Sequence, residues 1–215
     1  MLRSTQHYNR PYRLGVLVSG RGTNLQALME ACAAGEIFAD VALVGCNRVD
    51  APAVERARAA GVPVCVADRA AIPKREARQQ VLLDALQAAQ VDLVVLAGYD
   101  EILSPSFVAA FAGRMINTHP SLLPAFAGTM RAVQQALEHG VKVTGCTVHL
   151  VTDEPDGGPI LFQRCVNVRD DDTVESLHTR ILAEEHKLLP AAVRALAEGR
   201  VRIEGRRARV IASAK

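Results

Sequence analysis

"LGVLVSGRGTNLQALMEACAAG", residues 14–35, decides the fold class of this chain. Residues 14–18 form a short apolar run rich in valine and leucine, which is typical of a buried strand. A polar turn with two glycines follows at 19–24, and residues 25–35 show helical spacing of apolar side chains with a glycine stop. We therefore predict a strand, a tight turn and a helix in direct succession.

The same unit recurs through the first half of the chain. Apolar segments at 41–46, 62–67 and 91–98 are followed by two helical patterns and, after the last, by a short segment ending near Ala112. Strands that are apolar throughout and alternate with helices are typical of a parallel sheet covered on both faces. We therefore predict an α/β fold with a mostly parallel twisted sheet and helices on both faces.

The second half has a different character. A short strand at 115–117 is followed by two longer ones, at 141–151 and 159–168, which the loop "TDEPDGG" joins. A connection of this length suits a hairpin with a sizeable loop. Thr173 is placed to cap a C-terminal helix that ends at Gly199.

The chain of 215 residues is long enough for one domain with a substantial core. We expect this single domain to span residues 13–200. A polar N-terminal tail is expected at 1–12 and a C-terminal tail at 201–215, where the basic segment "EGRRARV" is typical of a solvated end.

Composition excludes several classes of protein. A formal net charge of +2 is too small for a nucleic-acid groove, and the five cysteines form no CxxC pair, which argues against a disulfide framework or a structural zinc site. No apolar run near the start is long enough for a signal peptide or a membrane span. We expect a cytoplasmic protein that binds neither nucleic acid nor membrane.

The glycine turn "SGRGTNLQ" is a candidate anion site. Free backbone N–H groups and the helix dipole favour a phosphate at such a turn, although an ordinary tight turn has the same pattern. A dinucleotide fits less well, because Leu25 stands where the third glycine of that fingerprint would fall. One monophosphate fits better, with Thr23 and Asn24 as side-chain donors.

"INTHPSLLPAF", residues 116–126, is the second candidate site. Alternation along a strand puts Asn117 and His119 on one face, and Pro120 keeps His119 out of a helix. A strand end with ordinary turn hydrogen bonds is the competing interpretation. On a later strand His149 is interpreted as structural, because a lone strand histidine is more often structural than catalytic.

The acidic loop at 152–158 supplies a partner for these groups. Asp156 precedes two glycines that allow close approach of the backbone. A metal site built from His119, His149 and Asp156 lacks any short ligand spacing, so no metal is expected. An amide, an imidazole and a carboxylate together suit acyl transfer to an amine, since they stabilise an oxyanion and relay a proton.

Four segments in this order, "SGRGTNLQ", "LAGYDEILSP", "NTHPSLLP" and "VTDEPDGGPI", resemble the phosphoribosylglycinamide formyltransferase family, across roughly residues 13–200. The resemblance implies a formyltransferase fold, with a Rossmann-like N-terminal half that binds the nucleotide and a C-terminal half that shapes the folate cleft. It implies transfer of the formyl group of 10-formyltetrahydrofolate to the amine of glycinamide ribonucleotide, in purine biosynthesis.

The family's functional positions carry over by motif. Asn117, His119 and Asp156 resemble the catalytic trio. The residues that the resemblance assigns to the ribonucleotide are Gly22, Thr23, Asn24 and Glu185. Those that it assigns to the folate are Arg75, Tyr99, Asp100, Glu101, Ile102, Leu103, Asn117, Thr152, Asp153, Glu154, Pro155 and Asp156.

Two segments depart from the family pattern. Asp100 and Glu101 stand where the family commonly has Met-Arg, so two anions replace a cation that would meet the folate's carboxylates. A family histidine is absent from "AGTMRAV", where Thr129 and Met130 precede a new Arg131.

Three alternative functions share parts of this sequence pattern. A methionyl-tRNA formyltransferase would need a further C-terminal domain and a basic face, and a formyltetrahydrofolate hydrolase would need a preceding regulatory domain. A non-catalytic folate or nucleotide binding module stays open because of the two departures. Both a monomer and a homodimer are compatible with the sequence.

Overall fold

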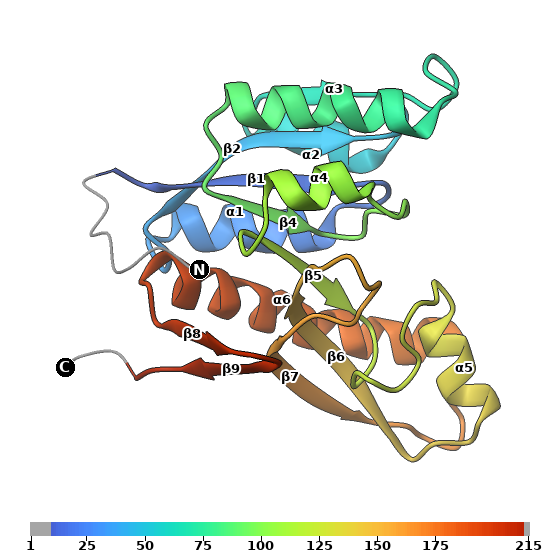
Figure 1. The fold of residues 1–215 in the computed structure, drawn as a ribbon. Helices are drawn as coiled ribbons and strands as arrows, with labels where there is room; N and C mark the ends of the chain where they lie inside the picture. Colours follow the sequence, from blue (N-terminus) through green and yellow to red (C-terminus); the bar gives the residue numbers. More distant parts are fainter. Residues whose placement is uncertain (1–9, 213–215) are drawn as a thin grey trace.

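The computed structural model describes residues 10–212, and within them a nine-stranded sheet is flanked by six helices (Figure 1). The strands are β1 (Tyr12–Val18), β2 (Ala39–Cys46), β3 (Val64–Val66), β4 (Leu93–Leu96), β5 (Met115–His119), β6 (Val143–Leu150), β7 (Ile160–Asn167), β8 (Val201–Glu204) and β9 (Arg207–Val210). The helices are α1 (Thr23–Ala33), α2 (Pro52–Ala59), α3 (Arg75–Ala88), α4 (Pro105–Ala110), α5 (Ala132–Glu138) and α6 (Val174–Ala197).

The strand order is β3-β2-β1-β4-β5-β6-β7-β9-β8. Strands β1 to β5 pair in parallel, whereas β5 with β6 and β6 with β7 are antiparallel. The predicted α/β fold, with its mostly parallel sheet and a longer strand pair in the second half, is confirmed. The chain order reverses between β1 and β4, and ligands bind at such a switch point, beyond the carboxyl ends of the strands.

Helices cover both faces of the sheet because the strands are apolar on both sides. Leu14, Val16 and Val18 of β1 pack in one core with buried residues of α1, α2 and α6. Leu17 of β1 faces the opposite core, which α3 and α4 complete. Gly15 lets α3 approach the sheet, since a Cβ there would lie 2.2 Å from Leu86 Cδ2.

The expected C-terminal tail is wrong for residues 201–210. They form the β8–β9 hairpin, which extends the sheet because β9 pairs with β7. Val201 is buried in the core, and Ile203 and Ala208 pack against it. Side chains alternate between the two faces of a strand, so a basic segment can expose its arginines on one face while its other face is buried.

The expected N-terminal tail lies mostly outside the described residues, and β1 already includes Tyr12. At the other end, α6 runs without interruption through the buried Pro190. No helix among the described residues is long and apolar enough to cross a membrane.

Candidate active site

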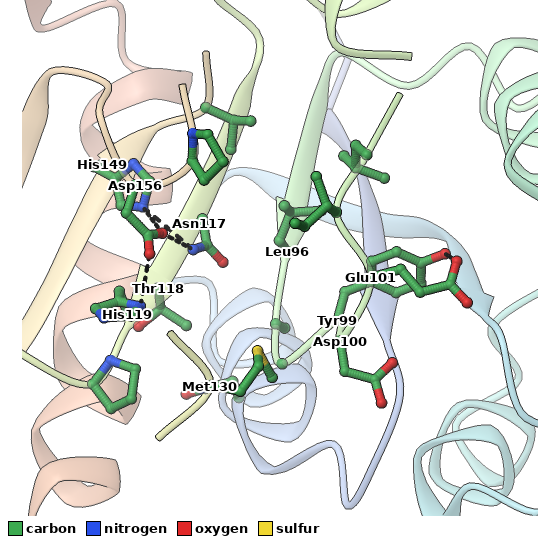
Figure 2. Close-up of a pocket in the computed structure, with 18 of the residues that line it drawn as sticks. Leu96, Tyr99, Asp100, Glu101, Asn117, Thr118, His119, Met130, His149 and Asp156 are labelled. Carbon is green, nitrogen blue, oxygen red and sulfur yellow. Dashed lines mark hydrogen bonds and ion pairs between the residues drawn. The ribbon is translucent and has the colours of Figure 1, made fainter. Parts of the chain in front are cut away.

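A cavity of about 650 Å³ lies beyond the carboxyl ends of β1, β4 and β5 (Figure 2). Many of the residues that line it were assigned to a site from the sequence. Those residues are Gly22, Thr23, Asn24, Tyr99, Asp100, Glu101, Ile102, Leu103, Asn117, His119, Thr152, Asp153, Pro155, Asp156 and Glu185. Segments up to 163 positions apart in the chain, from Gly22 to Glu185, therefore meet in one place.

Asn117, His119 and Asp156 lie together on one side of this cavity (Figure 2). Asn117 and His119 alternate along β5, and the loop after β6 brings Asp156 to them. His119 Nδ1 is 3.3 Å from Asp156 Oδ2, and Asn117 Nδ2 is 3.4 Å from Asp156 Oδ1. The carboxylate thus touches both of the groups that the sequence placed on one strand face.

Asp156 is held as an anion. Burial alone would raise its pKa, but contacts with His149 and His119 and the Gly128 N–H at 2.8 Å lower it to about 2. Its backbone is left-handed, with φ 53°, an uncommon conformation for a residue other than glycine. A carboxylate that stays ionised at neutral pH can orient an imidazole and receive a proton.

His119 makes a second contact through its other ring nitrogen. Nε2 lies 2.9 Å from the carbonyl oxygen of Phe126. A carbonyl only accepts hydrogen bonds, so Nε2 carries a proton and donates it. With Asp156 at Nδ1, both nitrogens face acceptors, and the doubly protonated ring satisfies both of them.

His149 belongs to the same cluster, and its interpretation as structural missed this. Its Nδ1 donates to the Leu150 carbonyl at 2.9 Å, and its Nε2 lies 3.4 Å from Asp156 Oδ1. Nε2 lies 3.3 Å from Asn117 Nδ2, so it fixes the orientation of that amide. The signal is the cross-strand pair Asn117–His149, which depends on the antiparallel register of β5 and β6.

Another side of the cavity is formed by the glycine turn and by α6. Gly22 has φ 71°, and a Cβ there would lie 2.6 Å from Ala53 Cβ. The Asn24 amide Nδ2 donates to Glu185 Oε2 at 2.7 Å, and both residues are buried. Burial raises the pKa of Glu185, although the hydrogen bond from Asn24 opposes this.

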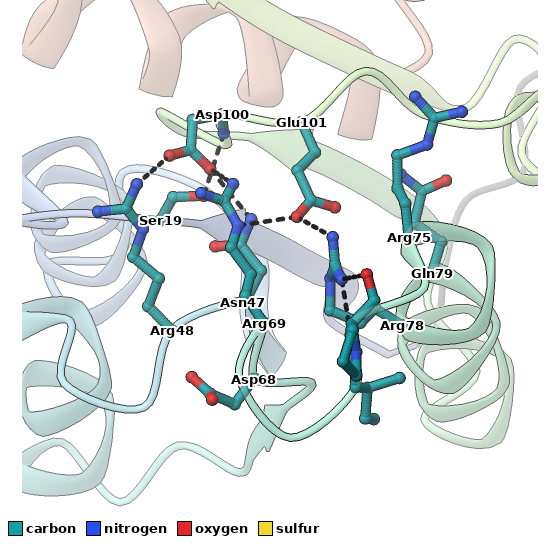
Figure 3. A network of polar contacts seen from close by, with 12 residues as sticks. Ser19, Asn47, Arg48, Asp68, Arg69, Arg75, Arg78, Gln79, Asp100 and Glu101 are labelled. Carbon is teal, nitrogen blue, oxygen red and sulfur yellow. Dashed lines mark hydrogen bonds and ion pairs between the residues drawn. The ribbon is translucent and has the colours of Figure 1, made fainter.

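Opposite Asn117, His119 and Asp156, residues 99–103 form a wall (Figure 2). The two anions that replace the family's cation are neutralised, because arginines surround both carboxylates (Figure 3). Asp100 pairs with Arg48 at 2.6 Å and also with Arg69. Glu101 lies 2.8 Å from both Arg69 and Arg78. Two carboxylates and three guanidinium groups leave this cluster with a net charge of +1.

Two residues assigned to the folate do not line the cavity. Arg75 pairs with its neighbour Glu76 at 3.0 Å, and its guanidinium group lies apart from the network (Figure 3). Glu154 is 3.7 Å from Arg206, in the turn of the β8–β9 hairpin. Sequence position alone does not fix where these two long side chains are directed.

The segment 129–131, which differs from the family pattern, also lies at the cavity, because Thr129 and Met130 line it. Met130 lines the cavity and is 78% exposed, so it also faces solvent. Among residues 10–212, no group of three or more His, Cys, Asp or Glu side chains has an arrangement that would hold a metal ion.

Known proteins with similar sequences are formyltransferases. A family model described as formyl transferase matches residues 12–193. A phosphoribosylglycinamide formyltransferase of Mycobacterium tuberculosis is 49% identical over 198 residues, covering 92% of this chain and 91% of that protein. The enzyme of the same name from Escherichia coli is 42% identical over 188 residues, covering 87% and 88%.

Solved structures agree with the sequence matches. Glycinamide ribonucleotide transformylase 1 from Symbiobacterium toebii has a TM-score of 0.92 at 51% identity, covering 98% of this chain and all of that chain (100%). A formyltetrahydrofolate deformylase from Pseudomonas syringae has a TM-score of 0.88 at 28% identity, covering 95% of this chain and 67% of that chain.

Proposed function

The chain belongs to the formyl transferase family, and on that premise we propose that it formylates glycinamide ribonucleotide with 10-formyltetrahydrofolate. This is a step of purine biosynthesis, and relatives that cover most of the chain carry the name of that activity. We place the reaction in the cytoplasm, with two small-molecule substrates and no metal.

One observation supports the proposal above the others. A single cavity contains an anion-favouring turn at 22–24, a wall at 99–103 whose two carboxylates are paired with arginines, and the trio Asn117, His119 and Asp156. The wall offers backbone groups and apolar side chains, because its two carboxylates are paired with arginines. The trio thus lies where an amine on the ribonucleotide and a formyl group on the folate would meet.

The reaction proposed is direct attack of the amine nitrogen on the formyl carbon. A carbon–nitrogen bond forms and the formyl oxygen becomes an oxyanion, which the Asn117 amide and the His119 imidazolium stabilise by hydrogen bonds. The bond from the formyl carbon to N10 of the folate then breaks, and the proton lost by the amine is transferred to N10. Asp156 assists this transfer as a proton acceptor and donor.

The contacts of the trio set a condition on this step. His119 Nε2 donates to the Phe126 carbonyl, so the oxyanion must replace that carbonyl as the acceptor. Asn117 Nδ2 makes only long contacts, of 3.3 and 3.4 Å, and such contacts are weak. Its N–H groups are therefore available to a developing negative charge.

The test is an assay with both substrates and the purified protein. We expect formylated ribonucleotide and tetrahydrofolate in equal amounts, and a loss of about 10²–10³ in kcat for His119→Ala. Release of formate without the ribonucleotide would support the hydrolase alternative. Binding of both substrates without turnover would support a non-catalytic binding module, and either result would refute the proposal.

A further inference from the structure

The loop after β5, residues 120–126, carries the hydrogen-bond acceptor of His119. The Phe126 carbonyl oxygen lies 2.9 Å from His119 Nε2. Phe126 has φ 57°, a left-handed conformation that a bulky residue adopts only where the surrounding structure holds it. The contacts that hold this loop therefore decide where the carbonyl stands and how the imidazole ring is oriented.

Hydrogen bonds within the loop close it on the end of β5. The buried Ser121 donates from its backbone N–H to the His119 carbonyl at 2.9 Å. Its hydroxyl group donates to the Ala125 carbonyl at 2.5 Å. The residue directly before Phe126 is thus tied to the strand that carries His119.

Thr147, on β6, fixes the loop to the sheet. It is fully buried and lies opposite His119 in the antiparallel register of β5 and β6. Its hydroxyl group donates to the Ser121 carbonyl at 2.7 Å and accepts from the Leu123 N–H at 3.1 Å. One side chain therefore holds the loop at two backbone positions.

Gln163, on β7, completes the connection. It lies opposite Thr147 in the register of β6 and β7, so His119, Thr147 and Gln163 form a row across three neighbouring strands. The Gln163 amide Nε2 donates to Thr147 Oγ1 and to the Leu123 carbonyl, both at 3.0 Å. The Thr147 hydroxyl group then uses its one donor and both of its acceptor sites.

Neither side chain lines the cavity, so neither Thr147 nor Gln163 contacts a ligand there. We infer that Thr147 and Gln163 are positioning residues, which hold the Phe126 carbonyl against His119 and so keep the imidazole oriented for the oxyanion. The inference rests on the proposed function, because that function supplies the oxyanion. A loop without these bonds would let the ring take several orientations, and a small misplacement of a reacting group lowers the rate.

Steady-state kinetics with both substrates is the first test, on Thr147→Val, Thr147→Ser and Gln163→Met. Valine keeps the shape of threonine without the hydroxyl group, and methionine keeps the length of glutamine without the amide. We expect kcat to fall about 10- to 100-fold for Thr147→Val and about 3- to 10-fold for Gln163→Met, with each KM within about twofold of wild type. Thr147→Ser keeps the hydroxyl group and should stay within about threefold of wild type.

A ¹H–¹⁵N spectrum of the histidine rings is the second test and requires no turnover. The chain has six histidines, and the His119 signal is identified by its absence in His119→Ala. In wild type we expect a hydrogen-bonded Nε2–H that exchanges slowly with water. Exchange should be at least about tenfold faster in Gln163→Met, whose substituted residue is exposed, so that the fold tolerates the change even if Thr147→Val does not fold.

Gln80→Met is the matched control, since Gln80 is an exposed glutamine on α3 that donates to Asp84 at 2.7 Å. It should change neither kcat nor the His119 signal. The inference is overturned if Gln163→Met lowers Tm but leaves kcat and the His119 signal as in wild type, or if KM rises while kcat is unchanged. A wild-type protein with the expected His119 signals that does not formylate the ribonucleotide would refute the proposed function alone.

Discussion

Replacing Glu101 by glutamine tests whether the acidic pair in the cavity wall holds the structure together. The Glu101 side chain is 7% exposed, and its Oε1 accepts from Arg69 and Arg78 at 2.8 Å each. Oε2 accepts a weaker bond from the Tyr99 hydroxyl at 3.3 Å. Glutamine keeps the size of the side chain but removes the negative charge.

The expected loss follows from the contacts that remain. Removing one partner of a buried ion pair typically costs about 3–5 kcal/mol. Here Arg78 keeps the carbonyls of Ile72 and Pro73, at 2.6 and 2.7 Å, and Arg69 keeps Asp100. We therefore expect Glu101→Gln to lower the free energy of unfolding by about 2–3 kcal/mol, a drop in Tm of about 4–12 °C.

The assay is thermal and denaturant unfolding followed by circular dichroism at neutral pH. Glu76→Gln is the matched control, because its carboxylate is 68% exposed and pairs with Arg75 on the surface. This variant should stay within about 0.5 kcal/mol of wild type. The same small effect for Glu101→Gln would refute the reasoning.

The pH dependence gives a second check on Glu101. Burial raises its pKa, but the hydrogen bonds from Arg78 and Arg69 outweigh this and lower it below the usual value. The stability that Glu101 contributes is therefore present above its unfolded pKa of about 4.3 and is lost as the pH falls through the folded value. The difference between wild type and Glu101→Gln should shrink in that acidic range.

Three further predictions concern the cavity. Asp156→Asn should lower kcat by about 10²-fold or more with little change in ribonucleotide affinity, measured by steady-state kinetics beside calorimetry, because it removes the anion that contacts His119; an unchanged kcat in a chemistry-limited assay would exclude the role. Asn24→Ala should weaken ribonucleotide binding by about 1.5–3 kcal/mol in calorimetry and leave folate binding unchanged, since it removes the donor to Glu185; the opposite pattern would assign this turn to the folate. Glu185→Gln should be more stable than wild type by at least about 1 kcal/mol at pH 8, because the pKa of Glu185 is raised and wild type loses stability as this carboxyl group loses its proton at rising pH. A difference in Tm between Glu185→Gln and wild type that is the same at pH 5 and at pH 8 would contradict this.

The sequence by itself determined the local features of this protein. Periodicity located the first strand, the glycine turn and the first helix, and alternation put Asn117 and His119 on one face of β5. These features depend only on residues close together in the chain. For the same reason the resemblance, which rests on short segments, indicated both the family and the trio.

The tertiary structure decided which distant side chains meet. The antiparallel register of β5 and β6 pairs His149 with Asn117, and the arginines at 48, 69 and 78 neutralise the acidic wall. Pairing with β7 makes the basic end of the chain a hairpin of the sheet. None of these follows from local pattern, because a residue's charge and spacing do not state which strand becomes its neighbour or where a long side chain is directed.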